Sequence, residues 1–361
     1  MRFAYFAGFS LAFFISFVLT FIVSRIAFRK QIIDIPDNER KFHKYPTPTL
    51  GGLAVFGSFL FVSVTMVFTG HMLGNIPMRE LIGIWVGGII LMVGGYLDDK
   101  YRLSPGYTII FPILACLTVV TSGISAVSLN IPWTGDKLLL DEIIIYGVPL
   151  ISGIVVFLWT LGMTYTTKIL DGMDGLVTGI AAIAGMVLFG LSLTPAVQQP
   201  QTALLAMIFV GSLLGFLILN FYPAKIFLGE GGSTFAGYML AILAIVSGGK
   251  VATAILVMGI PVLDLFWVIL QRIFNRQSPF QGDRRHLHYK LTEIGFSEPQ
   301  AVLFMYALTG IFGVSALFLQ SMGKLIALGI LVGVMIVIIV TIFIIYKSKQ
   351  NKSGTVHRGR T

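Results

Sequence analysis

Apolar stretches separated by short polar segments recur along almost the entire chain. Each stretch holds about 15 to 22 residues, which is close to the length that an α-helix needs to cross a bilayer. We therefore expect an all-α polytopic membrane protein, built as a bundle of about 11 transmembrane helices. The predicted helices are Ala4–Ser24, Leu50–Thr69, Leu81–Leu97, Thr108–Val127, Gly147–Thr164, Gly175–Leu193, Ala203–Asn220, Thr234–Ser247, Val251–Leu270, Ala301–Leu319 and Leu325–Tyr346.

The composition also indicates a membrane protein. Of the 361 residues, 56% are hydrophobic and 11% are charged, whereas a soluble domain carries about 25% charged residues. The mean hydropathy is +0.90. The formal net charge of +9 would indicate a nucleic-acid partner in a soluble protein, but the cytoplasmic loops of membrane proteins are rich in Lys and Arg. We therefore expect a membrane-lipid environment and no nucleic-acid partner.

The basic residues indicate how the chain is oriented. Arg25, Arg29 and Lys30 follow the first apolar stretch, so this end stays in the cytoplasm and the N-terminus lies outside. In a cleavable signal peptide the basic residues would precede the apolar core instead. An odd number of helices then places the C-terminus in the cytoplasm. Twenty of the 25 Lys and Arg residues fall in the predicted inner loops, as this orientation requires.

We expect one membrane domain followed by a short tail. Residues 1–346 form the predicted integral membrane domain, and residues 347–361 form a basic cytoplasmic tail, which is predicted to be disordered. The longest outer loop, residues 128–146, contains a Gly-Asp turn that predicts a small β-hairpin. Ser297 and Gln300 predict a capping box at the start of the helix that follows them.

Asp171 and Asp174 mark the candidate site. They lie three residues apart between apolar stretches, and a glycine follows each of them. If the segment opens a helix, the two side chains share one face and can point at one target. A carboxylate pair beside the hydrocarbon region is costly, which indicates a functional role, although Asp and Gly are also common in solvated turns. Asp264, inside another apolar stretch, is expected to pair with a polar group of the bundle.

The other predicted inner loops add polar residues on the same side of the membrane. Their candidate side chains are Lys41, His43, Asp98, Asp99, Lys168, Asn220, Glu230, Asp283, Arg284, Arg285, His286 and His288. Carboxylates with few histidines and no thiols suit a hard cation, Mg²⁺ or alternatively Mn²⁺. Asp98 and Asp99 are adjacent, so on a helix they diverge by about 100° and one of them at a time can face a metal.

Two further motifs have both a structural and a functional interpretation. Gly229–Ser233 precedes an apolar stretch, and backbone N–H groups at a helix start can bind phosphate. Glycines equally form loops between packed helices. His286 and His288 lie two residues apart, which is not the i, i+4 spacing of a helical zinc pair. With Arg284 and Arg285 they indicate phosphate binding or proton donation, or else a solvated basic loop.

Six segments of the inner loops, taken in order, carry a resemblance to a known family. They are Pro46–Gly52, Asp98–Asp99, Asp171–Leu176, Asn220 with Pro223 and Ala224, Gly229–Ser233, and His286–His288. Together they resemble the polyprenyl-phosphate N-acetylhexosamine-1-phosphate transferases. The resemblance implies transfer of a sugar 1-phosphate from a UDP-N-acetylhexosamine to a polyprenyl phosphate, with Mg²⁺ or Mn²⁺ and release of UMP. It also implies a multi-pass protein of the cell membrane whose active site is cytoplasmic.

The histidine loop indicates one branch of this family. Asp283–His288, with Ser278–Phe280 before it, resembles the GlcNAc-1-phosphate transferases that act on undecaprenyl phosphate and start O-antigen, teichoic acid or related glycans. The triple-histidine motif of the phospho-MurNAc-pentapeptide transferases is absent from this loop. The chain also departs from the family pattern, because Lys168 stands where asparagine is usual and Glu230 stands where aspartate is usual.

The resemblance also implies roles for these residues. Asp171 and Glu230 are the expected metal ligands beside the donor diphosphate. Asp98 and Asp99 are expected near the acceptor phosphate as base or positioning groups, and Asp174 completes the predicted catalytic set. The expected substrate-binding residues are Lys41, His43, Lys168, Asn220, Asp283, Arg284, Arg285, His286 and His288. The acceptor phosphate has a second pKa near 6, so it is already largely a dianion at neutral pH and needs no strong base. The main difficulty of the reaction is then to bring two anions together.

Several alternatives are open at this point. One is a phospho-MurNAc-pentapeptide transferase. Another is a secondary transporter, but a transporter places ionisable residues near the bilayer midplane, whereas here they gather at the inner ends of the predicted helices. A third is an inactive relative that binds a lipid-linked sugar, which the unusual residues Lys168 and Glu230 favour. A homodimer is an alternative to a monomer.

Overall fold

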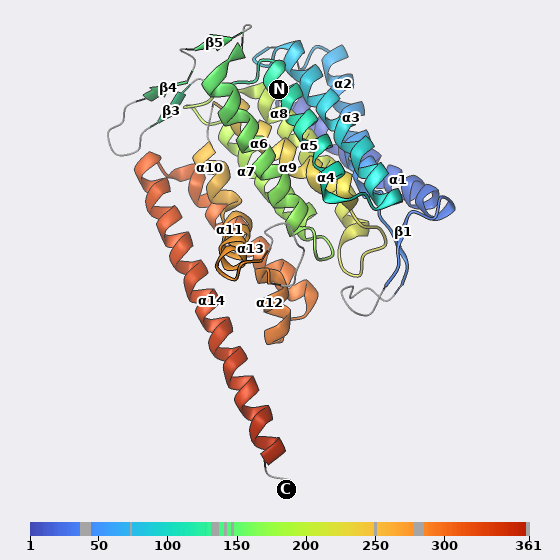
Figure 1. The fold of residues 1–361 in the computed structure, drawn as a ribbon. Helices are drawn as coiled ribbons and strands as arrows, with labels where there is room; N and C mark the ends of the chain where they lie inside the picture. Colours follow the sequence, from blue (N-terminus) through green and yellow to red (C-terminus); the bar gives the residue numbers. More distant parts are fainter. Residues whose placement is uncertain are drawn as a thin grey trace.

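The computed structural model describes residues 1–36, 45–72, 74–126, 128–130, 137–140, 143–145, 148–248, 251–277 and 285–358. Helices dominate these residues and run side by side as a bundle (Figure 1). The helices are α1 (Arg2–Arg29), α2 (Gly51–Phe68), α3 (Met78–Tyr101), α4 (Pro105–Thr108), α5 (Ile110–Thr121), α6 (Leu150–Leu170), α7 (Leu176–Ser192), α8 (Pro200–Asn220), α9 (Gly229–Val246), α10 (Val251–Val257), α11 (Gly259–Phe274), α12 (Leu287–Ile294), α13 (Glu298–Phe318) and α14 (Ser321–Arg358).

The strands among these residues are short and lie at the two ends of the bundle (Figure 1). They form three antiparallel pairs. The pairs are β1 (Ile33–Asp34) with β2 (Thr47–Pro48), β3 (Ser128–Asn130) with β4 (Lys137–Leu139), and β5 (Ile144–Ile145) with β6 (Val148–Pro149). The β3–β4 pair confirms the hairpin predicted in the longest outer loop, while its turn lies outside the described residues.

Every predicted apolar stretch coincides with an apolar helix of the structure. Within the described part of the chain, eight helices are long and apolar enough to cross a membrane. Helices α10 and α11 form a further candidate that is bent by 77°, and two shorter apolar helices occupy Pro105–Thr121 and Leu176–Ser192. The all-α polytopic architecture is therefore confirmed. The count of about 11 spans and their orientation stay predictions.

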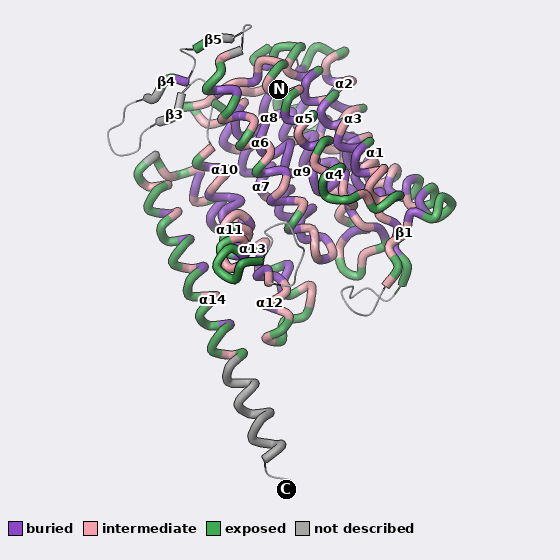
Figure 2. Tube along the Cα trace, in the orientation of Figure 1, coloured by how far each residue is buried: buried purple, intermediate pink, exposed green. Residues whose placement is uncertain are grey.

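The centre of the bundle is formed by α8 and α9, and α1 and α14 lie at its edge (Figure 2). In the apolar windows of α8 and α9, 78% and 83% of the residues are buried, against 28% in α1 and 11% in α14. A cluster of edge-to-face phenyl rings joins α2, α8 and α9 through Phe59, Phe209 and Phe235. Such ring pairs add to the free energy gained by burying apolar surface.

The ends of two C-terminal helices can be compared with the prediction. The capping box at Ser297 and Gln300 is present, and the Ser297 backbone N–H donates to Gln300 Oε1 at 2.9 Å. Helix α14 extends past the apolar stretch as far as Arg358. The division into a membrane domain, residues 1–346, and a disordered basic tail, residues 347–361, stays a prediction.

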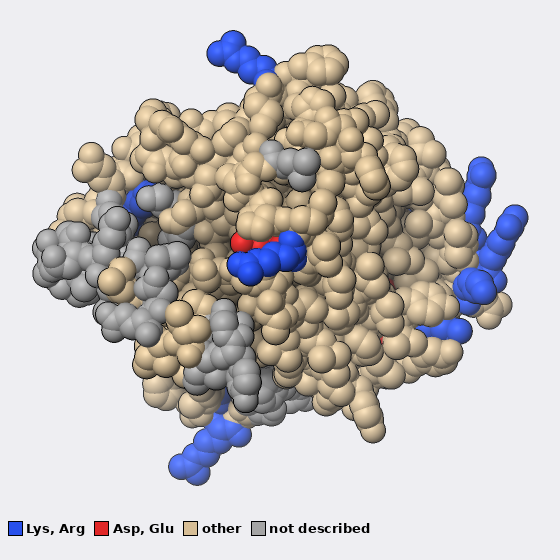
Figure 3. Space-filling view, turned by 90° about the horizontal axis from the view of Figure 1, so that it is seen from above, with Lys and Arg blue, Asp and Glu red and all other residues tan. Residues whose placement is uncertain are grey.

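Figure 3 looks onto the end of the molecule that carries strands β3 to β5, opposite the C-terminus. Most of the described part of this face is neither acidic nor basic; Lys and Arg side chains project at its rim, and a small basic group beside an acidic side chain lies near its centre. Lys and Arg are enriched in the cytoplasmic loops of membrane proteins, so the predicted orientation places this face outside the cytoplasm.

The predicted orientation can be tested with introduced cysteines. The single natural cysteine, Cys116, is buried, so background labelling is expected to be low. Lys44→Cys and Gln281→Cys should react with a membrane-impermeant maleimide only in inverted vesicles, since both positions lie in predicted cytoplasmic loops. His71→Cys, in the exposed turn between α2 and α3, is the control and should react in intact cells. Labelling of Lys44→Cys from outside would contradict the orientation.

Candidate active site

The ends of three helices form the candidate site. Asp98 and Asp99 were predicted in a loop, but they lie in the last turn of α3, which continues to Tyr101. Gly229–Ser233 was predicted to precede a helix, but it forms the first turn of α9. Polar residues do not end a helix by themselves, and α3 ends where Arg102 adopts the left-handed conformation with φ of 50°.

Four carboxylates meet at these helix ends, and we call them the carboxylate cluster: Asp98, Asp99, Asp171 and Glu230. Asp99 Oδ1 accepts a hydrogen bond from the backbone N–H of Glu230 at 3.4 Å. The charges of Asp98, Asp171 and Glu230 all act on Asp99. Lys168 places its Nζ atom 2.5 Å from Glu230 Oε1 and its charge also acts on Asp98. The structure therefore brings these predicted site residues together, with one ammonium among four carboxylates.

The link between α6 and α7 carries Asp171 and Asp174. The expectation that the two carboxylates share a helix face is wrong, because α6 ends at Leu170 and α7 begins at Leu176. Gly175 takes φ of +75° between them, a conformation that glycine adopts without a steric penalty. The turn interpretation therefore holds for the backbone, although Asp171 lies inside the carboxylate cluster rather than in solvent.

The pKa of Asp171 is raised to about 8, first by burial and then by the negative charges of Glu230 and Asp174. Uncompensated negative charge of this kind favours the uptake of a cation. Among the described residues, no group of three or more His, Cys, Asp or Glu side chains is arranged as a ready-made metal site. Mg²⁺ does not require one, since one or two carboxylates usually hold it with water and substrate phosphates. The donor set therefore fits the expected metal.

Asp174 and Asn220 are engaged with the segment between α8 and α9. Asp174 Oδ2 accepts a hydrogen bond from the backbone N–H of Ala224 at 2.8 Å. The buried Asn220 amide donates to the carbonyl oxygen of Ile226 at 3.0 Å and accepts from the Thr178 hydroxyl at 2.7 Å. These contacts hold the segment in place ahead of α9. The predicted catalytic role of Asp174 and substrate-binding role of Asn220 stay predictions.

The glycine motif serves helix packing in this structure. A Cβ atom at Gly95 of α3 would overlap the backbone of Gly231, and one at Gly52 of α2 would overlap the backbone of Gly232. The backbone N–H groups of Gly51 and Gly52 donate to the carbonyl oxygens of the two residues before α9, at 3.0 and 2.7 Å. Of the two interpretations, packed helices therefore describe this motif.

The histidine segment begins helix α12. His286 is the residue before the helix, and its Nδ1 atom lies 2.9 Å from Asp264 Oδ2 of α11. The backbone N–H of Leu287 donates to Asp264 Oδ1 at 2.8 Å. The expectation that Asp264 pairs with a polar group of the bundle is confirmed. No sequence pattern indicated that the partner would be a candidate site residue 22 positions away.

Helix α12 contacts the link that carries Asp171. The Tyr289 hydroxyl donates to the carbonyl oxygen of Gly172 at 3.2 Å, and a Cβ atom on Gly172 would lie 2.8 Å from His288 Nε2. The rings of His286 and His288 are nearly parallel, with centroids 5.8 Å apart. His288 is fully buried, and neither ring nitrogen has a hydrogen-bond partner among the described residues. Two predicted motifs more than 100 residues apart thus meet at Gly172.

His288 should make the protein sensitive to mild acid. Its pKa is lowered to about 3, first by burial and then by the neighbouring His286, whereas an unfolded histidine titrates near 6.5. Between these values the unfolded chain binds more protons, so this contribution to stability is lost as the pH falls below about 6.5, by about 1.4 kcal/mol per pH unit. We expect His288→Gln to show a smaller drop in unfolding free energy between about pH 7 and about pH 5. An unchanged pH slope would contradict the burial of a neutral imidazole.

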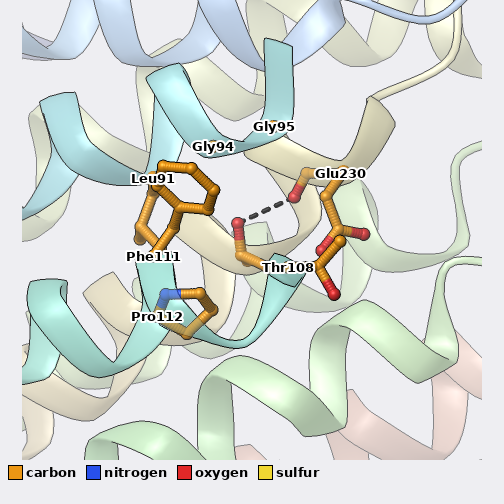
Figure 4. A pocket seen from close by; sticks show the side chains of 8 residues that line it. Leu91, Gly94, Gly95, Thr108, Phe111, Pro112 and Glu230 are labelled. Atoms are coloured by element: carbon orange, nitrogen blue, oxygen red, sulfur yellow. Dashed lines mark hydrogen bonds between the residues drawn. The ribbon is translucent and has the colours of Figure 1, made fainter. Parts of the chain in front are cut away.

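A hollow of about 10 Å³ lies beside Glu230, between α3, α4, α5 and α9 (Figure 4). Its lining residues are Leu91, Gly94, Gly95, Thr108, Phe111, Pro112, Glu230 and Thr234. The Thr234 hydroxyl donates to the Glu230 carbonyl oxygen at 2.7 Å, which is the dashed line in the figure. A space of this size holds about one water molecule, whereas ligand sites of about 300–1,000 Å³ are usual for small molecules.

Several predicted residues cannot be placed in this site. Lys41, His43, Asp283 and Arg284 lie outside the described residues. Arg285 is described and half-buried next to His286. Their predicted role in binding substrate stays a prediction.

The helix bundle and its carboxylate cluster define a polytopic membrane protein with a polar site at one end of its helices. The model of glycosyl transferase family 4 matches residues 81–248. A probable undecaprenyl-phosphate N-acetylglucosaminyl 1-phosphate transferase of Bacillus subtilis is 32% identical over 311 residues, which cover 84% of this chain and 82% of that protein. The chain therefore belongs to glycosyl transferase family 4.

Two other relatives come from distant bacteria. A decaprenyl-phosphate N-acetylglucosaminephosphotransferase of Mycobacterium leprae is 30% identical, over 82% of this chain and 79% of that protein. An undecaprenyl-phosphate alpha-N-acetylglucosaminyl 1-phosphate transferase of Thermotoga maritima is 28% identical, over 81% of this chain and 84% of that protein. Both similarities extend over most of each chain, so they include the helices that carry the site.

Proposed function

We propose that this protein transfers GlcNAc 1-phosphate from UDP-GlcNAc to a polyprenyl phosphate, of which undecaprenyl phosphate is the expected form, and releases UMP. The reaction would take place at the cytoplasmic face of the cell membrane and start a lipid-linked glycan of the cell envelope. The observation that carries the proposal is the carboxylate cluster with Lys168 at the helix ends. The names of the relatives support the GlcNAc 1-phosphate donor and the polyprenyl phosphate acceptor.

The donor would bind where Asp171 and Glu230 can share a divalent cation with its diphosphate. A bound Mg²⁺, or Mn²⁺ in its place, would neutralise charge on the diphosphate and make UMP a better leaving group. Asp171 has a raised pKa in the free protein, so it would release a proton when a cation binds. Lys168 adds a second positive charge at the same place, 2.5 Å from Glu230.

The acceptor would meet the donor beside Asp98 and Asp99 at the end of α3. A phosphate monoester is largely a dianion at neutral pH, so these carboxylates would position the acceptor and take up its residual proton. Negative charge around an incoming dianion opposes binding, which makes the cation and the basic residues necessary.

The proposal is tested by UMP release from purified protein in nanodiscs, supplied with UDP-GlcNAc, undecaprenyl phosphate and Mg²⁺. UMP should appear only when both substrates are present, and UDP-GlcNAc should be consumed in preference to UDP-MurNAc-pentapeptide in a mixture of the two. Tunicamycin, which mimics a sugar nucleotide with a lipid tail, should inhibit. Preferential use of the pentapeptide donor would contradict the proposed branch, and binding of substrates without UMP would favour the inactive relative. The UMP-release assay gives the same answer whether the purified protein is a homodimer or a monomer.

A further inference from the structure

Asp264 is a buried carboxylate outside the carboxylate cluster. It lies in α11, in the second half of the bent pair, and is 3% exposed. Burying a carboxylate is costly unless its oxygens are satisfied. Here both oxygens are used, since Oδ2 lies 2.9 Å from His286 Nδ1 and Oδ1 accepts from the backbone N–H of Leu287 at 2.8 Å.

These two contacts fix the chemistry of the His286 ring. A carboxylate can only accept, so the Nδ1 atom of His286 carries the hydrogen of the 2.9 Å contact. The Nε2 atom is then free to accept when the ring is neutral and to donate when the ring is charged.

The held ring lies next to the site already described. His286 stacks on His288, and His288 contacts Gly172, the residue after Asp171. Both His288 nitrogens are buried without a hydrogen-bond partner among the described residues. Buried polar atoms without a partner are rare in folded proteins, and each one calls for an explanation. A ligand that reaches this histidine pair would therefore gain hydrogen bonds that the protein itself leaves unmade.

We propose that Asp264 is a positioning residue that orients His286 so that its Nε2 atom contacts the bound nucleoside diphosphate sugar. This inference rests on the proposed function for the identity of the ligand. Asp264 acts through His286 and does not itself touch the substrate. With the hydrogen held on Nδ1 by Asp264, Nε2 is the ring nitrogen that is left to meet the ligand.

The competing explanation is that Asp264 merely anchors helix α12. Asp264→Asn separates the two explanations, because asparagine has the same shape and its Oδ1 can still accept from the Leu287 N–H. Its amide group, however, would donate toward His286 Nδ1, so the ring would carry its hydrogen on Nε2 instead. The anchor is retained, and the hydrogen-bonding role of Nε2 is changed.

The experiment measures UDP-GlcNAc affinity by calorimetry in the presence of Mg²⁺, together with unfolding temperature and UMP release, for Asp264→Asn, His286→Gln and the double variant. We expect each single variant to weaken binding by about tenfold or more, with the unfolding temperature within about 2 °C of the natural protein. The double variant should bind no more weakly than His286→Gln alone, because both changes remove the same interaction. Glu293→Gln, in the exposed pair with Lys290 on α12, is the matched control and should bind as the natural protein does.

Three outcomes would overturn the inference. Unchanged affinity in Asp264→Asn would show that the ring does not depend on its carboxylate. A loss of affinity that follows a loss of folded protein would show an anchor only. Additive losses in the double variant would show that Asp264 acts apart from His286. The affinity measurement does not require turnover, so it can be separated from the test of the proposed function. If the natural protein binds UDP-GlcNAc without releasing UMP, the proposed function is refuted and this test still applies. If the natural protein does not bind UDP-GlcNAc, both proposals are refuted.

Discussion

Lys168→Asn and Glu230→Asp should each lower turnover sharply, and the double variant should recover much of the loss. Lys168 Nζ lies 2.5 Å from Glu230 Oε1, and the two side chains are 22% and 16% exposed. Removing Lys168 leaves Glu230 without its cation among the other carboxylates of the cluster, and breaking a fully buried pair costs about 3–5 kcal/mol. Because this pair is partly exposed, we expect the free-energy cost of breaking it to be smaller. Glu230→Asp shortens the carboxylate by one methylene and leaves the ammonium without its contact.

The double variant restores the family pattern of asparagine at position 168 and aspartate at position 230, so that no ammonium is left without its contact and the carboxylate has the length that the family pattern uses. A double-mutant cycle on the rate of UMP release, repeated at several Mg²⁺ concentrations, measures the coupling between the two positions. The exposed ion pair of Lys290 and Glu293 on α12, at 2.6 Å, supplies the control cycle, for which we expect little coupling. Additive losses at positions 168 and 230 would mean that Glu230 acts independently of Lys168. Full activity and unchanged Mg²⁺ dependence in Glu230→Ala would exclude Glu230 as a metal ligand.

Gly95→Ala should destabilise the protein and abolish most of its activity. The new Cβ atom would overlap the backbone N and Cα atoms of Gly231. Backbone atoms cannot relieve this overlap by a rotamer change, as a side chain could. Overpacking of this kind costs about 1–3 kcal/mol even where side chains can adjust. Moving α9 away from α3 would also displace Glu230 from Asp99, whose carboxylate accepts the Glu230 N–H. Unfolding temperature and UMP release of the purified variant measure the two effects.

The matched control is Gly162→Ala in the middle of α6. A Cβ atom there would meet nothing within 4 Å, and alanine favours a helix over glycine by about 1 kcal/mol. We therefore expect this variant to unfold at the same temperature or slightly higher, with normal activity. Normal stability and turnover in Gly95→Ala would contradict the close approach of α3 and α9.

The helices were predictable because hydrocarbon imposes a simple rule on the sequence. Each span needs an unbroken apolar stretch of fixed length, and all the predicted stretches coincide with helices. The ends were less predictable, because polar residues such as Asp98 and Asp99 can extend a helix beyond the apolar region. The same limit applies to the far end of α14, where helix continues through residues 347–358.

The residues of the site were predictable as a set, but their pairings were not. Carboxylates gathered at predicted loop positions indicated that Asp98, Asp99, Asp171 and Glu230 would meet, and the structure places them in one cluster. The partner of Asp264 could not be found in this way, because a hydrogen bond across 22 residues depends on how α11 and α12 pack. The glycine motif left two interpretations open for a related reason, since the same residues permit phosphate binding and close helix crossing.

The glycine crossing gives the two walls of the site different stiffness. On one side, α2, α3 and α9 approach each other backbone to backbone at Gly52, Gly95, Gly231 and Gly232. On the other side, α12 contacts the Asp171 link through the Tyr289 hydroxyl, and Asp264 connects it to the bent pair. If substrate binding displaces one of these walls, we therefore expect α12 to move rather than α9. The histidines expected to contact the donor would then move together with that helix.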